Sequence, residues 1–125
     1  MELWEICLTA LLPLVLLVAG LFTRIGLPRK VNWFVGYRTP MACKNQDTWA
    51  FAHKYWGKLM IIFGIIILAL CIIIVILNKR GVFEPEDGYI LGASAIITTV
   101  LVFISMIPTE IALRKEFDKD GIRKQ

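Results

Sequence analysis

Residues that commonly perform catalysis are scarce in this sequence, and their spacing brings none of them together. The single histidine, His53, has no aspartate or glutamate within helical reach, and the nearest acid before it is Asp47. The cysteines stand far apart, at Cys7, Cys43 and Cys71, and form no CxxC or Cys/His pattern of a metal site. There is also no nucleophile elbow and no glycine-rich phosphate loop. We therefore expect no enzyme activity, no metal and no cofactor.

Arg38 is the side chain best suited to binding. It follows the aromatic Tyr37 and precedes Thr39 and Pro40, so its loop is expected to be ordered. A guanidinium held in place can bind a phosphate headgroup, a carboxylate or the carbonyl end of a helix in bidentate fashion. Glu110 is a candidate partner within the chain. A ligand-binding role for Arg38 and a structural role that ties the loop to a helix end both remain open.

The passage around Arg38 is the main polar stretch of the chain. Seven of the fourteen basic residues lie between Arg24 and Lys58, together with three of the four tryptophans. Gly36 permits a turn with positive φ. Asn45 or Asp47 can cap the helix that follows. In that helix, residues 49, 52, 53 and 56 repeat at helical spacing, which predicts an amphipathic segment at the membrane interface.

Three long apolar runs define the fold class. The chain has 125 residues, 58% of them apolar, and a mean hydropathy of +0.69. Uncharged runs over residues 6–23, 59–77 and 89–107 are each long enough to cross a membrane. We predict an all-α, polytopic membrane protein formed by one domain over 1–125, with an interfacial amphipathic segment before its second span. The spans are expected at about 3–23, 57–77 and 89–108, with loops 24–56 and 78–88 and a tail 109–125.

The distribution of charge predicts an orientation. The N-terminus and loop 78–88 hold two basic residues and five acids, whereas the passage 24–58 and the tail hold twelve basic residues and five acids. The positive-inside rule then places the N-terminus outside, and the Arg38 loop and the C-terminus in the cytoplasm. Anionic lipid headgroups at the cytoplasmic face are expected partners of Lys54 and Lys58, and direct binding to nucleic acid is not expected.

Small and polar residues within the spans predict close helix packing. In the second span they recur every seven residues, and in the third they occupy two faces. A polar path through the membrane would normally require an ionisable group at mid-depth, which the runs lack. Pro108 is expected to end or kink the third helix, and the charged tail is expected to be a solvated helical extension. The second-span residues are Gly57, Gly64, Cys71 and Asn78, and the third-span faces are Gly92/Ala95/Thr99 and Ser94/Thr98/Ser105.

The loop and the segment that follows it contain one composite motif. It reads Asn32-x-x-x-Gly36-Tyr37-Arg38-Thr39-Pro40, then Trp49-x-x-Ala52-His53-Lys54-x-x-Gly57-Lys58. This motif closely resembles the signature of the SdpI/YfhL family, immunity proteins of the sporulation-delaying-protein type. The resemblance implies protection of a bacterial cell from a secreted, membrane-active peptide. For the family's best-known member, which is longer and has further spans ahead of this unit, it also implies capture of a cytoplasmic repressor at the membrane. Asn is common in the family where this chain has His53, so an amide-like role is expected for that side chain.

The leading hypothesis is thus an immunity-type protein of the bacterial cytoplasmic membrane that neutralises a peptide toxin and can signal by recruiting a cytoplasmic repressor. The alternative is a lipid-binding or small-molecule transport subunit that acts as a homo-oligomer. An intramembrane enzyme ranks last, because no nucleophile is in place. The candidate ligand- or partner-binding residues are Asn32, Gly36, Tyr37, Arg38, Thr39, Pro40, Trp49, His53, Lys54, Lys58 and Glu110.

Overall fold

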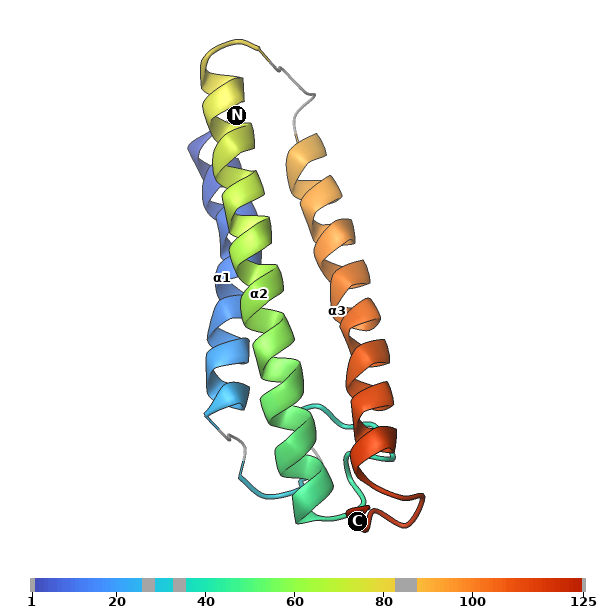
Figure 1. The fold of residues 1–125 in the computed structure, drawn as a ribbon. Helices are drawn as coiled ribbons and strands as arrows, with labels where there is room; N and C mark the ends of the chain where they lie inside the picture. Colours follow the sequence, from blue (N-terminus) through green and yellow to red (C-terminus); the bar gives the residue numbers. More distant parts are fainter. Residues whose placement is uncertain (1, 26–28, 33–35, 83–87, 125) are drawn as a thin grey trace.

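Three long helices make up the fold, in a computed structural model that describes residues 2–25, 29–32, 36–82 and 88–124. Helix α1 spans Leu3–Arg24, α2 spans Gln46–Lys79 and α3 spans Tyr89–Glu116 (Figure 1). Within the described residues the only β structure is an isolated bridge in the tail. All three helices are long and apolar enough to cross a membrane. The predicted all-α architecture with three transmembrane helices is therefore confirmed.

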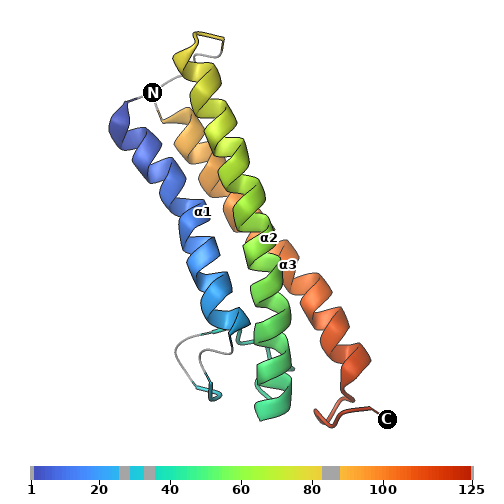
Figure 2. The ribbon, with the colours of Figure 1, turned by 60° about the vertical axis from the view of Figure 1, so that its left-hand side comes forward.

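The predicted amphipathic segment is the beginning of α2 and runs without a break into the apolar part of the helix. Asn45 caps the helix: its side chain accepts the Thr48 N–H at 2.9 Å, and the Thr48 hydroxyl accepts the Asn45 N–H at 3.1 Å. The 34 residues of α2 correspond to roughly 51 Å, well beyond a hydrocarbon core of about 30 Å. We therefore infer that the first turns of α2 extend past the membrane core. Figure 2 shows this end of α2 next to the loop that precedes it.

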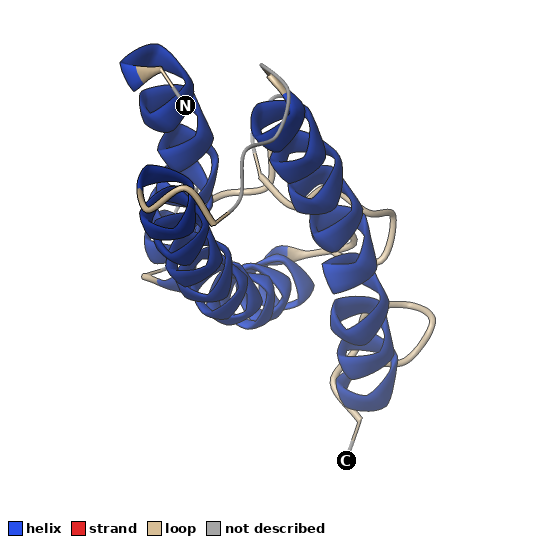
Figure 3. Cartoon of the chain, turned by 90° about the horizontal axis from the view of Figure 1, so that it is seen from above, coloured by secondary structure: helices blue, strands red, loops and turns tan. Residues whose placement is uncertain are grey.

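The distribution of exposed and buried side chains differs from that of a soluble protein. Small and polar side chains such as Thr9, Thr98 and Ser105 are buried between the helices, while large apolar ones such as Ile65 and Phe103 are 56% and 64% exposed. A lipid environment removes the penalty for exposing apolar side chains, and small residues allow the helices to approach closely. Viewed from above, α3 lies on one side of the α1–α2 pair (Figure 3).

Helices α1 and α2 touch backbone to backbone at their small residues. A Cβ atom on Gly57 would lie 2.8 Å from the carbonyl oxygen of Gly20 and 2.6 Å from the backbone nitrogen of Arg24. A Cβ atom on Gly64 would lie 2.8 Å from the side chain of Leu17. A larger side chain at Gly57 would require movement of α1, and one at Gly64 would displace the side chain of Leu17. The packing role predicted for these glycines is confirmed, and their partner is α1.

A buried carboxylate links two helices at the end of the bundle that contains the N-terminus. Glu5, in the first turn of α1, is 3% exposed. Its carboxylate accepts the backbone N–H of Glu2 at 3.0 Å and that of Gly88, the residue that caps α3. The first interaction caps α1, and the second ties the beginning of α1 to the beginning of α3.

The end of α3 differs from its prediction in two ways. The helix does not end at Pro108 but continues to Glu116. Residues 117–124 are not a helical extension: Phe117 and Arg123 form an antiparallel bridge, and the Asp118 N–H donates to the carbonyl of Ile122 at 2.8 Å. A buried aromatic explains the turn, because Phe117 is 1% exposed and anchors the chain as it folds back.

Candidate functional site

Tyr37 is the residue through which the loop contacts both α2 and α3. Its backbone N–H donates to Nε2 of His53 on α2 at 3.0 Å. Its hydroxyl donates to Oε1 of Glu110 on α3 at 2.9 Å and lies 3.3 Å from the carbonyl oxygen of Met106. The side chain is 3% exposed. One loop residue therefore contacts α2 and α3 at the same time.

The two hydrogen bonds of His53 define its protonation state. Nδ1 lies 2.8 Å from the carbonyl oxygen of Trp49, which can only accept, so Nδ1 carries the proton. Nε2 receives the N–H of Tyr37 and must present a lone pair. A cationic ring would place two donors against each other at Nε2. His53, fully buried, is thus a neutral connector with one donor and one acceptor, the two functions that an amide would also provide.

Position 36 requires glycine, because a larger residue would collide with His53. Its φ angle is +119°, in the region that favours glycine. A Cβ atom there would lie 2.5 Å from Nε2 of His53 and 3.1 Å from the indole ring of Trp49. The Trp49 and His53 rings pack with centroids 4.1 Å apart, and Trp49 is 1% exposed. The Gly-Tyr pair thus fits the surface that Trp49 and His53 present, one turn apart on α2.

Thr39 and Pro40 begin the turn that leads into α2. The Thr39 hydroxyl accepts the N–H of Ala42 at 3.3 Å, and the Thr39 carbonyl accepts the N–H of Cys43 at 3.0 Å. The carbonyl of Ala42 in turn receives the hydroxyl of Thr48 at 3.0 Å. Thr39 is buried and Pro40 is exposed. These contacts connect the loop to the capped start of α2, so that the loop and helix form one unit.

An aromatic pair continues the contact toward the membrane. The rings of Tyr37 and Trp56 lie 5.5 Å apart, and the Trp56 indole N–H donates to the hydroxyl of Ser105 on α3 at 2.9 Å. Closer to the beginning of α2, Phe51 packs edge to face on Phe117 with centroids 5.7 Å apart. Ser105 belongs to a face of the third span that was predicted to pack against another helix, whereas Phe117 was not predicted to contribute, because its contact depends on how α3 lies against α2.

The charged candidates lie at the surface of this unit. Arg38, Lys54 and Lys58 are exposed. Glu110, the partner considered for Arg38, is half-buried and accepts the hydroxyl of Tyr37, the residue just before Arg38. The amide of Asn32 donates to the carbonyl of Lys30 at 3.1 Å. The predicted residues therefore divide into a buried scaffold and an exposed group of cations.

Burial determines the chemistry of the Tyr37 hydroxyl. Loss of solvent, and then the neighbouring Glu110 carboxylate, raise the pKa of Tyr37 well above its usual value. The hydroxyl thus stays protonated and acts as a donor. In the part of the chain that the structure describes, no three His, Cys, Asp or Glu side chains gather as a metal site would require. The arrangement is suited to positioning and binding.

Comparison with known proteins gives a family match over this region. The model of the SdpI/YfhL protein family matches residues 29–110, which include the loop, all of α2 and most of α3. A curated relative, "Uncharacterized protein YfhL" of Bacillus subtilis (strain 168), is 33% identical over 52 residues, covering 42% of this chain and 47% of the relative. The aligned part is therefore about half the length of that relative. No solved structure matches the chain.

Proposed function

Because the chain belongs to the SdpI/YfhL family, we propose that it is an immunity-type protein of a bacterial cytoplasmic membrane that protects the cell against a secreted, membrane-active peptide toxin. The observation that carries the proposal is that the family match covers the loop, all of α2 and α3 as far as Glu110. Several of the residues that resemble the family signature form the contact between the loop and α2. Gly36 and Tyr37 sit on Trp49 and His53.

The proposal assigns different roles to the buried and exposed signature residues. Tyr37, Trp49 and His53 are buried, so they are assigned to the scaffold that holds the loop in place. Arg38 and Lys58 are exposed cations on that scaffold, so they are assigned to recognition of the toxin or of a cytoplasmic regulator. No catalytic step, metal or cofactor is part of the proposal.

The proposed orientation has the N-terminus outside and the loop and C-terminus in the cytoplasm. The excess of basic residues in segments 24–58 and 109–125 supports it. Cys43, half-buried in the turn before α2, provides the test, with Cys7 and Cys71 replaced by serine. An impermeant thiol reagent should label Cys43 in inverted vesicles and not in intact cells. Labelling in intact cells would reverse the orientation.

Survival of a sensitive bacterium tests the immunity role. Cells expressing the wild type, Arg38→Ala or Lys119→Ala at equal membrane levels would be exposed to a panel of secreted peptide toxins. We expect protection by the wild type and by Lys119→Ala, since Lys119 is an exposed cation of the tail, outside the signature. Loss of protection with Arg38→Ala alone would place recognition in the loop. Absence of protection by the wild type against every toxin would reject the immunity role.

Recruitment of a cytoplasmic repressor is the signalling form of the same proposal. It predicts that a soluble DNA-binding protein encoded beside this chain moves to the membrane fraction when toxin is present. A repressor that stays soluble under toxin would restrict the function to protection.

A lipid-binding role is the second candidate, either by itself or as part of a homo-oligomeric transport subunit. The observation that favours it is a group of exposed cations where α1 and α2 meet, at the end of their apolar runs.

A further inference from the structure

Three cations lie together where α1 meets α2. Arg24 is the last residue of α1, and Lys54 and Lys58 stand one turn apart on the same face of α2. All three are exposed. The close contact of Gly57 with the end of α1 brings them together, and Nη1 of Arg24 donates to the carbonyl oxygen of Lys54 at 3.3 Å. We call these three residues the α1–α2 basic corner.

The positive charge of this corner is not neutralised within the described part of the chain. The sequence has no acid between Glu5 and Asp47 and none between Asp47 and Glu84. Asp47 precedes Lys54 by seven residues, about 10 Å along the helix. The one ion pair found among the described residues joins Arg123 to Glu116 in the tail. An external anion is therefore the natural counter-charge for the corner.

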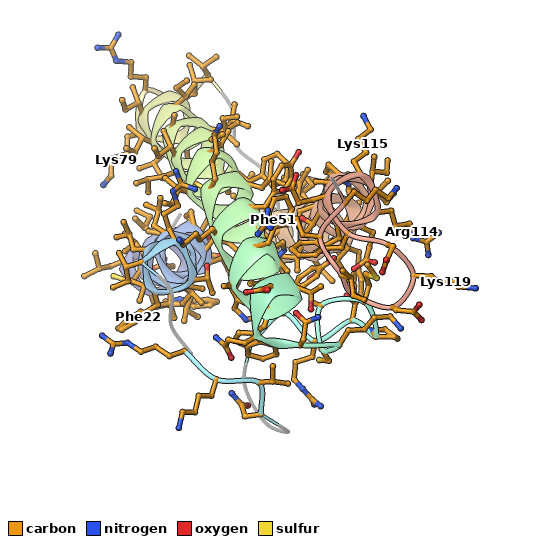
Figure 4. All side chains as sticks on the ribbon, turned by 60° about the horizontal axis from the view of Figure 1, so that its bottom comes forward. Phe22, Phe51, Lys79, Arg114, Lys115 and Lys119 are labelled. Atoms are coloured by element: carbon orange, nitrogen blue, oxygen red, sulfur yellow. The ribbon has the colours of Figure 1, made fainter. Side chains whose placement is uncertain are left out.

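Apolar surface continues directly from the cations toward the membrane. On α1, Leu21 and Phe22 are 55% and 53% exposed, within one turn of Arg24. On α2, Ile62 and Ile65 are 41% and 56% exposed, one to two turns beyond Lys58. Figure 4 shows Phe22 pointing away from the bundle on the outer side of α1. The corner thus offers cations at headgroup depth and an apolar surface at acyl-chain depth.

We propose that the α1–α2 basic corner binds an anionic glycerophospholipid of the cytoplasmic leaflet. Its phosphate accepts hydrogen bonds from the Arg24 guanidinium, held by the Lys54 carbonyl, and from the two lysine ammonium groups. Its acyl chains lie along Leu21 and Ile65. The proposal rests on the orientation given above and does not depend on the immunity role, so failure of either leaves the other testable.

The chain offers a matched control at the same end of the bundle. Arg114, Lys115 and Lys119 form a second basic group, which Figure 4 shows on the side of α3, away from Phe22 and α1. Arg114 is seven residues past Ile107, the end of the third apolar run, or about 10 Å beyond it. Replacing Lys115 and Lys119 removes the same charge from the same end without touching the corner.

The experiment measures lipid retention by native mass spectrometry. Protein in nanodiscs of phosphatidylcholine with one-third phosphatidylglycerol would be released, and the retained lipids counted. We expect the wild type to retain phosphatidylglycerol preferentially, and the double variant Lys54→Gln/Lys58→Gln to lose about 5-fold in preference per lysine, or about 30-fold in total. Lys115→Gln/Lys119→Gln should change the preference by less than about 2-fold. Lys54→Arg/Lys58→Arg keeps the charge and should retain it.

Three results would overturn the proposal. The first is a wild type without preference for phosphatidylglycerol. The second is equal loss in the corner variant and in the Lys115/Lys119 variant, which would show that only the total charge of this end matters. The third is complete displacement of the lipid by glycerol 3-phosphate at equal concentration, which would show that the acyl chains contribute nothing. Circular dichroism of each variant in phosphatidylcholine checks that the helices are intact.

Discussion

Replacing Tyr37 with phenylalanine removes one hydroxyl and leaves the loop backbone and its bond to His53 in place. That hydroxyl donates to Glu110 at 2.9 Å, and Tyr37 is almost fully buried. A hydrogen bond to a charged group contributes about 1.5–3 kcal/mol to the free energy of unfolding. Because Glu110 is half-buried, water can replace part of this contact in the variant. We therefore expect Tyr37→Phe to lower the free energy of unfolding by about 1–2 kcal/mol.

A double-mutant cycle separates this contact from general damage to the loop. Tyr37→Phe, Glu110→Ala and the double variant would be unfolded reversibly in mixed detergent micelles and followed by tryptophan fluorescence. Trp56, whose ring lies 5.5 Å from that of Tyr37, reports on the site. If the contact forms as described, the double variant should be at most a few tenths of a kcal/mol less stable than Glu110→Ala. The coupling energy between the two positions should then be about 1–2 kcal/mol.

Tyr89→Phe is the matched control, because Tyr89 carries the same hydroxyl but is 63% exposed at the beginning of α3. Its effect should stay within about 0.5 kcal/mol. A coupling energy below about 0.3 kcal/mol, with additive single effects, would show that the Tyr37 hydroxyl does not hold the loop to α3. Equal destabilisation by Tyr89→Phe would show that the assay responds to any lost hydroxyl.

Further predictions concern the glycines and pH. Gly36→Ala combines an unfavourable φ with a clash against His53. In the same unfolding assay it should lower the free energy of unfolding by about 2–3 kcal/mol. An effect below about 0.5 kcal/mol would contradict the observed geometry. Gly57→Ala should move α1 and so destabilise the protein by about 2 kcal/mol or more. Gly92→Ala is the control: no neighbouring atom lies within 4 Å of the added Cβ, so the change should be neutral or slightly stabilising. Equal effects of the two variants would argue against the contact between α1 and α2. The pKa of Tyr37 is raised in the folded state. The contribution of its hydroxyl to stability is therefore complete below the ordinary pKa of 10.0 and is lost as the pH rises from there toward the folded pKa. Between pH 10 and 11 the wild type should thus lose more stability than Tyr37→Phe, and parallel losses would refute the raised pKa.

The helices could be predicted from the sequence because each depends on a local property. An apolar run long enough to cross a membrane must form its hydrogen bonds within itself, so the run alone defines a helix. The cap at Asn45 is equally local, since it involves Thr48 three residues later. The amphipathic pattern of residues 49–56 indicated the beginning of α2, and the structure places the same residues against the loop and α3.

The tail could not be predicted in this way, because its conformation depends on residues far along the chain. Alternating charges over 114–120 are typical of a solvated helix. The observed turn depends instead on burial of Phe117 and on a hydrogen bond of 2.6 Å from the Asn45 amide to the carbonyl of Gly121, 76 residues later. Gly121, with φ of +81°, allows the reversal, but a glycine near the end of a chain does not indicate a turn by itself.

The site was partly predictable for a related reason. The motif identified the loop that contacts α2 and α3, and the positive φ expected to be possible at Gly36 is observed. Glu110 was considered as a partner of Arg38, and the structure shows that it accepts the hydroxyl of Tyr37. Neighbouring residues in an irregular loop point in different directions, and no periodicity indicates which one faces the protein. Only the fit of Gly36 over His53 determines that Tyr37 turns inward.

This division between buried and exposed signature residues determines how loss of protection should be interpreted. Variants of Gly36, Tyr37 or His53 disturb the fit of the loop on α2, so loss of protection in them would accompany loss of stability. Arg38 is exposed, and replacing an exposed side chain usually changes stability by no more than about 0.5 kcal/mol. Loss of protection by Arg38→Ala at unchanged stability would thus identify a contact with the toxin or regulator. Loss of protection together with loss of stability would instead indicate a structural role for Arg38. Lys54 and Lys58 would then remain as the exposed candidates for that contact.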